Sequence, residues 1–388
     1  MKRTLFTLLL LLLPTFLYSQ ISVGADRIES ILSEVDGKCI GMVVNHTSLL
    51  STPNHTHIVD TLNTLGVNIV RLYTPEHGLR GTMDAGASVA SGRDKKTGLP
   101  VISLYGNNRK PTPTQVAGID LMLFDLQDVG VRFYTYISTL TYVMEACAEA
   151  GIPIIILDRP NPHDTVDGAV RKEDRYRSFV SLLPIPAVHG LTLGEAAMMI
   201  NGEKWLKGGI KADVKVITVK GWRHGQPYNL ITPPSPNLKS NRAIALYPTL
   251  CYFEGTSWSE GRGTPNPFEQ IGYPNPHLGN HTFTPKSMIG ATRPKHQGKK
   301  CYGPDLETYQ WSKGIHLQVL IDAYRISQTQ GIKFFKHRQM FDLLAGSDQL
   351  RRQIISGQSA AEIRQSWQKD LQDYKRIRSK YLLYPDYE

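Results

Sequence analysis

Apolar runs alternate with helix-like segments over the first half of this chain, and this alternation limits the folds that the chain can adopt. The apolar runs are rich in β-branched residues, as buried strands are, and they lie at residues 39–45, 67–73, 119–126 and 152–158. Segments with helical spacing stand among them and end in glycine, at residues 57–66 and 135–151. Strands that alternate with helices form a parallel sheet covered on both faces. We therefore predict an α/β fold with a mainly parallel sheet.

The pattern changes after residue 228. Residues 230–243 are rich in proline, and residues 254–280 show little periodicity. An irregular stretch of this length in a compact domain is usually functional. We expect one domain over residues 20–228 and a smaller α+β domain over residues 229–388 that covers the carboxyl edge of the sheet.

The first 19 residues have the pattern of a secretory signal peptide, with a basic start, an apolar run and a small residue at Ser19. We therefore expect an exported protein, periplasmic or secreted. No later apolar run reaches about 20 residues, so we expect no membrane span. The net charge of +10 comes from scattered residues, which does not predict nucleic-acid binding but suits an anionic wall polymer. Nothing in the sequence predicts an oligomeric state.

The sequence lacks the common cofactor signatures. It has no GxGxxG, no GxxxxGK[ST] loop and no GxSxG elbow, so we expect no bound cofactor. The four cysteines are isolated and do not predict a zinc site: Cys39, Cys147, Cys251 and Cys301. We expect Cys39 and Cys147 to be small buried residues. The sequence does not decide whether Cys251 and Cys301 form a disulfide.

Polar side chains stand at the end of each of the four predicted strands or shortly after it. They include Asn45 and His46; Glu76 and His77; Asp125, Gln127 and Asp128; and Asp158, Arg159 and Asn161. The carboxyl ends of parallel strands meet at one edge of a sheet, where ligands bind. Carboxylates, amides and aromatic rings together suit a sugar, and two carboxylates can hydrolyse a glycoside. Glu76, placed after Pro75 at a strand end, is the favoured group for proton transfer.

Six ordered blocks resemble the exo-β-N-acetylmuramidases of the NamZ type, an exported bacterial family long described as a domain of unknown function. The blocks are PEHGLRG, DLQDVGVRFYTY, LDRPNP, HGLTLGE, PSPN and EGTSWSEGRGTPNPFEQIG, and the resemblance runs from about residue 38 to the terminal YLLYPDY. It implies a Rossmann-like domain and a smaller C-terminal domain with the active site in the cleft between them. It also implies release of terminal N-acetylmuramic acid from the non-reducing ends of peptidoglycan fragments, with Glu76 as the catalytic glutamate. The chain departs from the family at Ile231, where an aromatic residue is usual.

The remaining site residues follow from the residue types and their places. His77 is an expected orienting partner of Glu76, and Asp128 is the first choice for a second carboxylate, with Glu254, Glu260 and Glu269 as rivals. The acetamido oxygen of the substrate is a further alternative, and retaining or inverting chemistry stays open. We expect an arginine to bind the lactyl carboxylate of muramic acid, with Arg262 favoured over Arg132 and Arg80. The other substrate-binding candidates are Asn45, Asp125, Gln127, Tyr134, Asn237 and Ser259.

Two other functions fit the same residues. A protein that binds wall sugars without cleaving them is one, because fold alone does not determine function. A metal-dependent amide hydrolase that uses His46, His77 and Asp125 is the other. A polar loop at residues 82–98 is expected to border the cleft and to become ordered when a muropeptide binds.

Overall fold

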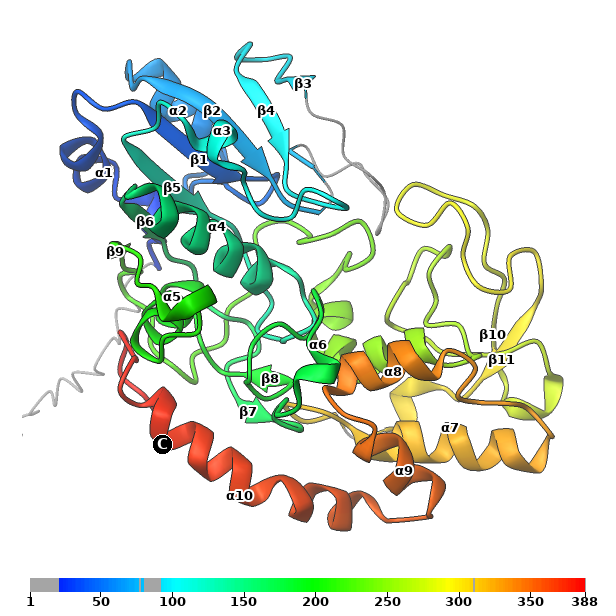
Figure 1. Ribbon diagram of the computed structural model, residues 1–388. Coiled ribbons are helices and arrows are strands. Elements are labelled where there is room, and N and C mark those ends of the chain that lie inside the picture. The colour runs from blue at the N-terminus through cyan, green and yellow to red at the C-terminus, as the bar shows by residue number, and fades with distance from the viewer. Residues whose placement is uncertain (1–20, 77, 80–91, 310, 388) are drawn as a thin grey trace, which may run out of the picture.

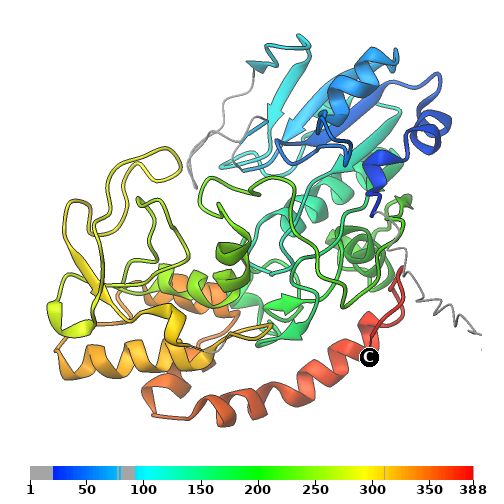
Figure 2. The same cartoon turned by 180° about the vertical axis from the view of Figure 1, so that it is seen from behind.

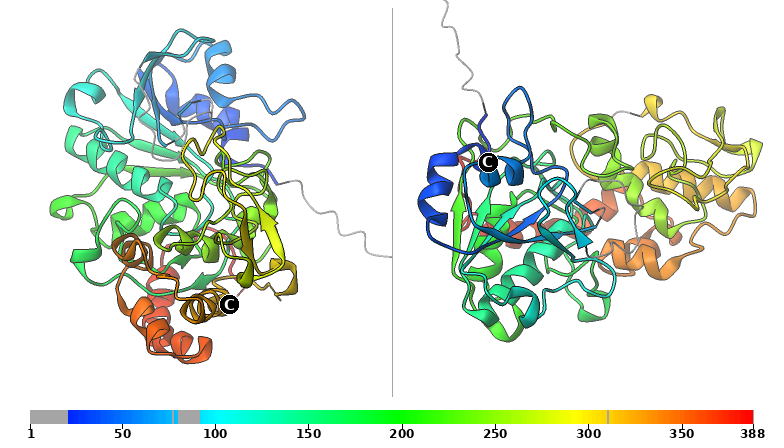
Figure 3. Two further views of the ribbon diagram at one scale, coloured as in Figure 1. Left: turned by 90° about the vertical axis from the view of Figure 1, so that its right-hand side faces the viewer. Right: turned by 90° about the horizontal axis from the view of Figure 1, so that it is seen from above.

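The computed structural model describes residues 21–76, 78–79, 92–309 and 311–387. The expected signal peptide, His77, Arg80 and residues 82–91 of the expected cleft loop lie outside the described residues. Within these ranges, no helix combines the length and apolar character that crossing a bilayer would require. We call residues 21–228 the N-terminal part and residues 229–387 the C-terminal part, and the two lie side by side (Figures 1 and 3).

The N-terminal part is built on a seven-stranded sheet in the order β3-β4-β2-β1-β5-β6-β9. The strands are β1 (Ile40–Val44), β2 (Ile69–Thr74), β3 (Gly92–Arg93), β4 (Pro100–Ser103), β5 (Leu121–Asp125), β6 (Ile154–Leu157) and β9 (Val214–Ile217). All neighbours pair in parallel except β3, which pairs antiparallel with β4. The mainly parallel sheet is thus confirmed, although the end of the expected cleft loop forms the short edge strand β3.

Helices cover both faces of this sheet because its strands are apolar on both sides. They are α1 (Ile28–Val35), α2 (Ile58–Thr64), α3 (Pro113–Val116), α4 (Tyr136–Ala150) and α5 (Leu193–Gly202). In β5, Leu121 and Leu123 pack in the cluster that contains residues of α1 and α2. Met122 and Phe124 pack instead with α4 and α5. Successive side chains of one strand thus serve two separate cores.

The C-terminal part is mostly helical, with long loops between its elements. Its helices are α6 (Asn241–Leu250), α7 (Leu317–Thr329), α8 (Arg338–Ala345), α9 (Gln349–Ile355) and α10 (Ala360–Arg378), and its strands are β10 (His281–Phe283) and β11 (Cys301–Gly303). Short 3₁₀ turns occur in both parts at Gly24–Asp26, Asp174–Tyr176, Lys207–Gly209, Cys251–Gly255, Pro276–Leu278 and Leu306–Thr308. Figure 2 shows α10 running back beneath both parts toward the sheet. One apolar cluster contains residues of α4, α5, α7 and α10, so the two parts share a core.

Several local expectations have clear outcomes. Capping boxes begin α5 at Thr192 and α10 at Ser359, and Glu195 belongs to the first of them. The short strands β7 (Val166–Asp167) and β8 (Val188–His189) pair with each other outside the main sheet. All four thiols are unpaired, and Cys39 is half-buried rather than buried.

Candidate active site

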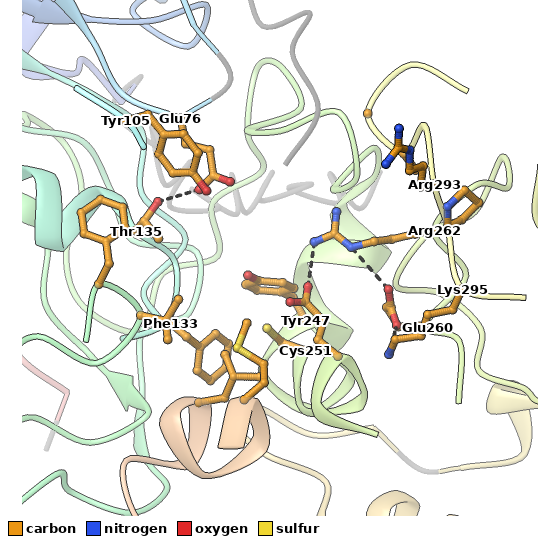
Figure 4. Close-up of a pocket in the computed structure, with 18 of the residues that line it drawn as sticks. Glu76, Tyr105, Phe133, Thr135, Tyr247, Cys251, Glu260, Arg262, Arg293 and Lys295 are labelled. Atoms are coloured by element: carbon orange, nitrogen blue, oxygen red, sulfur yellow. Dashed lines mark hydrogen bonds and ion pairs between the residues drawn. The ribbon is translucent and has the colours of Figure 1, made fainter. Parts of the chain in front are cut away.

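A cavity of about 530 Å³ lies where the two parts meet, at the carboxyl edge of the sheet. The N-terminal part contributes Glu76, Tyr105, Arg109, Phe133, Thr135 and Phe179 to its lining. The C-terminal part contributes Tyr247, Glu254, Glu260, Arg262, Arg293 and Lys295. A recess of about 50 Å³ shares Glu76, Phe133, Thr135, Tyr247 and Arg262 with the main cavity. The cavity therefore has one wall from each part (Figure 4).

Glu76 is held by hydroxyl groups on the N-terminal wall. It lies two residues after the end of β2, and the Thr135 hydroxyl, just before α4, donates to Glu76 Oε2 at 3.0 Å. The Tyr105 ring lies beside the carboxylate in Figure 4. Burial raises the pKa of Tyr105, and the charge of Glu76 and a hydrogen bond to it raise that pKa further. The Tyr105 phenol therefore stays protonated and can donate to Glu76.

On the opposing wall, acidic and basic side chains alternate in a chain of ion pairs. Arg262 Nη2 lies 2.7 Å from Glu254 Oε1, and Arg262 Nε lies 3.4 Å from Glu260 Oε1. Lys295 Nζ lies 3.1 Å from Glu260 Oε2. Burial opposes the charge of Glu260, but Lys295 and Arg262 outweigh it and hold the pKa of Glu260 below its usual value. Glu260 is therefore a carboxylate that stays ionised beside the cavity.

The comparisons with known proteins agree on one family. The models of the N-terminal and C-terminal domains of exo-β-N-acetylmuramidase NamZ match residues 40–242 and 245–384. The chain belongs to this family. The peptidoglycan β-N-acetylmuramidase NamZ of Bacillus subtilis (strain 168) is 38% identical over 376 residues, which cover 90% of this chain and 88% of that protein. The resemblance expected from the six sequence blocks is thereby confirmed.

Two crystal structures of DUF1343 family proteins from Bacteroides fragilis NCTC 9343 have the same fold. One has a TM-score of 0.86 at 41% sequence identity, and the match covers 95% of this chain and 100% of that structure. The other has a TM-score of 0.78 at 32% identity and covers 94% of this chain and 99% of its own. The likeness therefore extends over both NamZ domains.

The structure places five of the candidates named from sequence at the cavity or its recess. They are Glu76, Glu254, Glu260 and Arg262 in the main cavity and Tyr134 in the recess. Tyr134 turns its hydroxyl to the Pro234 carbonyl oxygen, at 2.8 Å. His77 and Arg80 lie outside the described residues.

Three of the other edge residues tie loops together instead. Asp125 is fully buried, and both of its oxygens accept from Arg159, at 2.6 and 2.9 Å. Asn45 Nδ2 donates to the Tyr136 hydroxyl, and Gln127 Nε2 donates to the carbonyl oxygens of residues 128 and 160. Because Arg159 already donates to both oxygens of Asp125, this carboxylate is not available as a metal ligand. The metal-dependent amide hydrolase considered from sequence would need Asp125 as one of its three ligands.

Asp128 and Arg132 are buried away from the cavity lining. Asp128 Oδ2 accepts from the Gly130 N–H at 2.7 Å, and it lies 3.7 Å from His189 Nε2. Arg132 is fully buried and donates to the carbonyl oxygens of residues 169, 185 and 344. Burial lowers the pKa of Arg132 to about 10. Its donors hold the two parts together, so we no longer expect Arg132 to bind the lactyl group.

The remaining candidates of the C-terminal part shape loops. Asn237 Nδ2 donates to the Gly290 carbonyl oxygen at 2.7 Å. Ser259 Oγ accepts from the Gly261 N–H at 3.1 Å, and Glu269 Oε1 accepts from the Ser240 hydroxyl at 2.5 Å. None of these three residues lines the main cavity or the recess in the described part of the chain.

Sequence reasoning missed several lining residues: Tyr105, Arg109, Phe179, Tyr247 and Arg293. Tyr105 and Arg109 follow β4, whose carboxyl end meets the same sheet edge as β2. The apolar residues of β4 are therefore the sequence signal that indicates the place of these two residues. Tyr247 lies in α6, and Phe179 and Arg293 lie in loops. No local pattern in the sequence indicates that these three segments meet at the cavity.

Proposed function

We propose that this chain releases terminal N-acetylmuramic acid from the non-reducing ends of peptidoglycan fragments, with Glu76 as its general acid. The observation that carries this proposal is the place of Glu76. It lies at the carboxyl end of a parallel strand, in a cavity between two parts, with a hydroxyl donor at 3.0 Å. Membership of the family and the expected role of this glutamate support the same assignment.

In this proposal Glu76 donates a proton to the glycosidic oxygen as the bond to the anomeric carbon breaks. A second group either attacks the anomeric carbon or takes a proton from the attacking water. The sugar ring would lie between the wall that holds Glu76 and the wall that holds Arg262. Phe133 and Tyr247, which line both spaces, offer it apolar surface.

We place the second carboxylate on the C-terminal wall rather than at Asp128. Glu254 and Glu260 both line the cavity, whereas Asp128 is buried outside its lining and accepts from the Gly130 N–H. Of the two, Glu254 is the more accessible, with a side chain that is 21% exposed against 3% for Glu260. The acetamido oxygen of the substrate remains an alternative nucleophile.

Export of the protein is part of the proposal and rests on the sequence of the first 19 residues. A protein that binds wall sugars without cleaving them is the second candidate function. Neutralising Glu76 separates the two, because a binding protein would keep its affinity and has no turnover to lose.

The test compares Glu76→Gln with the wild type on a chromogenic β-N-acetylmuramide. We expect turnover to fall at least about a hundredfold, since glutamine keeps the shape of the side chain but cannot donate the proton. Binding of N-acetylmuramic acid, measured by calorimetry, should persist. Glu254→Gln should also lower turnover strongly. Asp128→Asn is the comparison variant, because Asp128 is buried away from the cavity lining. Turnover of Glu76→Gln within a few-fold of the wild type would rule out the assignment.

A further inference from the structure

Four positively charged side chains line the cavity in the described part of the chain: Arg109, Arg262, Arg293 and Lys295. Two of them are already neutralised. Arg262 lies between Glu254 and Glu260, and Lys295 contacts Glu260 and donates to the carbonyl oxygens of residues 253 and 258. Arg262, the arginine favoured from sequence as the lactyl-binding group, therefore has its charge balanced within its own wall.

The two remaining cations differ in their surroundings. The Arg109 guanidinium lies over the Phe179 ring, 4.6 Å from its centroid, and that ring is 6.1 Å from the ring of Tyr105. Arg109 is thus seated on the wall of Glu76. Among the described residues, Arg293 makes no hydrogen bond, ion pair or ring contact, and its side chain is exposed. Figure 4 shows it beyond Arg262, across the cavity from Glu76 and Tyr105.

The backbone that carries Arg293 is nevertheless held on both sides. Before it, the Gly290 carbonyl oxygen accepts from Asn237, the last residue of the PSPN block. Gly290 packs so closely on that block that a Cβ there would lie 2.6 Å from Pro236 Cβ, and its φ of +88° favours glycine. After Arg293, a Cβ at Gly263 would lie 2.5 Å from Pro294 Cγ. A fixed backbone thus presents a guanidinium without a protein partner to the cavity.

We propose that Arg293 binds the lactyl carboxylate of the terminal N-acetylmuramic acid and so distinguishes it from N-acetylglucosamine. This inference rests on the proposed function. The lactyl group is on the third carbon of the ring, so it points away from the anomeric carbon that faces Glu76. Its carboxylate then reaches the opposing wall, where the planar guanidinium can form two parallel hydrogen bonds. Asn237 and Gly290 act as positioning residues for the segment that carries Arg293.

The experiment compares two substrates that differ only in the lactyl charge. One is a chromogenic β-N-acetylmuramide, and the other is its lactyl methyl ester. We expect the wild type to prefer the acid by at least about tenfold in kcat/KM, as the loss of a charge-assisted hydrogen bond predicts. In Arg293→Gln this preference should shrink to within about threefold, and activity on the ester should stay near that of the wild type. Arg293→Lys keeps the positive charge but loses the planar guanidinium, so its preference for the acid should lie between those of the wild type and Arg293→Gln.

Arg109→Gln is the matched control, because it removes one guanidinium from the other wall of the same cavity. It should keep the preference for the acid. An unchanged preference in Arg293→Gln overturns the assignment, and so does loss of the preference in Arg109→Gln alone. If the wild type cleaves neither substrate, the proposed function fails. Calorimetry with N-acetylmuramic acid and its methyl ester then still tests Arg293, since only the acid should bind more weakly to Arg293→Gln.

Discussion

Thr135 shows how one side chain serves both the fold and the site. It stands immediately before α4, at a point where a side chain often caps the helix, yet no helix N–H donates to its hydroxyl. The hydroxyl instead donates to Glu76 Oε2. Thr135 is only 8% exposed, so few other partners compete for that hydroxyl. We therefore regard Thr135 as a positioning residue for the proposed general acid.

Thr135→Val removes the hydroxyl but keeps the shape of the side chain. We expect kcat on the muramide to fall about ten- to a hundredfold, with a small change in KM, because the Glu76 side chain would no longer be held in the orientation in which it donates its proton. Thr135→Ser, which restores the hydroxyl, should recover activity to within about threefold of the wild type. If the serine variant is as slow as the valine variant, the hydroxyl has no positioning role.

At the scale of elements, two helices begin with the same signal in different surroundings. Thr192 and Glu195 start α5, and Ser359 and Glu362 start α10, each as a complete capping box. Ser359 is exposed, whereas Thr192 is 1% exposed and also donates to Asp158 Oδ2 at 2.7 Å. The capping box of α5 therefore also connects its helix to Asp158 at the end of β6, whereas the capping box of α10 only begins a helix.

This difference predicts unequal costs for the same substitution. Ser359→Ala should lower the free energy of unfolding by about 1 kcal/mol, as the loss of an N-cap does. Thr192→Ala should cost roughly 2–3 kcal/mol, because it also leaves buried Asp158 without one of its donors. Urea denaturation of the two variants beside the wild type measures both values. Equal costs would show that the bond to Asp158 adds nothing.

Over the whole molecule, the two parts are also connected by a buried cluster of charged side chains around His224. His224 Nδ1 lies 2.5 Å from Asp164 Oδ1, and His224 Nε2 lies 2.9 Å from Glu195 Oε1. Arg378, at the end of α10, contacts His224 and Asp386. Burial opposes a charge on His224, but the two carboxylates outweigh it and raise the pKa of His224 to about 9.

This cluster predicts a loss of stability at alkaline pH. A histidine whose folded pKa is raised contributes its full stability below its unfolded pKa of about 6.5 and loses it as the pH rises through about 9. Burial also raises the pKa of Asp158 to about 6, so its contribution is lost earlier, as the pH rises from about 4 through about 6. Both effects have the same sign.

Melting temperatures between pH 5 and pH 10 test the role of His224. The wild type should lose stability between about pH 6.5 and pH 9, by an amount on the order of 3 kcal/mol. His224→Gln should be less stable at pH 6 and should show a flatter profile across that window. A variant whose profile keeps the slope of the wild type would show that other groups titrate there.

Local signals in the sequence are enough to predict the family, the mainly parallel sheet and the place of Glu76. These follow from local signals, since apolar runs specify buried strands and a group directly after a strand must lie at the sheet edge. The capping boxes and the apolar stripe of α10 at Ile363, Trp367 and Leu371 are local in the same way, and all three stripe residues are buried. Short-range periodicity is enough for each of them.

Which polar groups face the cavity depends instead on contacts between segments far apart in the chain. Asp125, Asp128 and Glu76 all lie at the carboxyl ends of strands along one edge. Asp125 nevertheless accepts hydrogen bonds from Arg159, and Asp128 accepts one from a backbone N–H. Arg132 and Arg293 have the same side chain, but one is buried among carbonyl oxygens and the other is exposed at the cavity. The partner of a charged group depends on segments far away in the chain, and a buried charge must find one. No local pattern in the sequence records that choice.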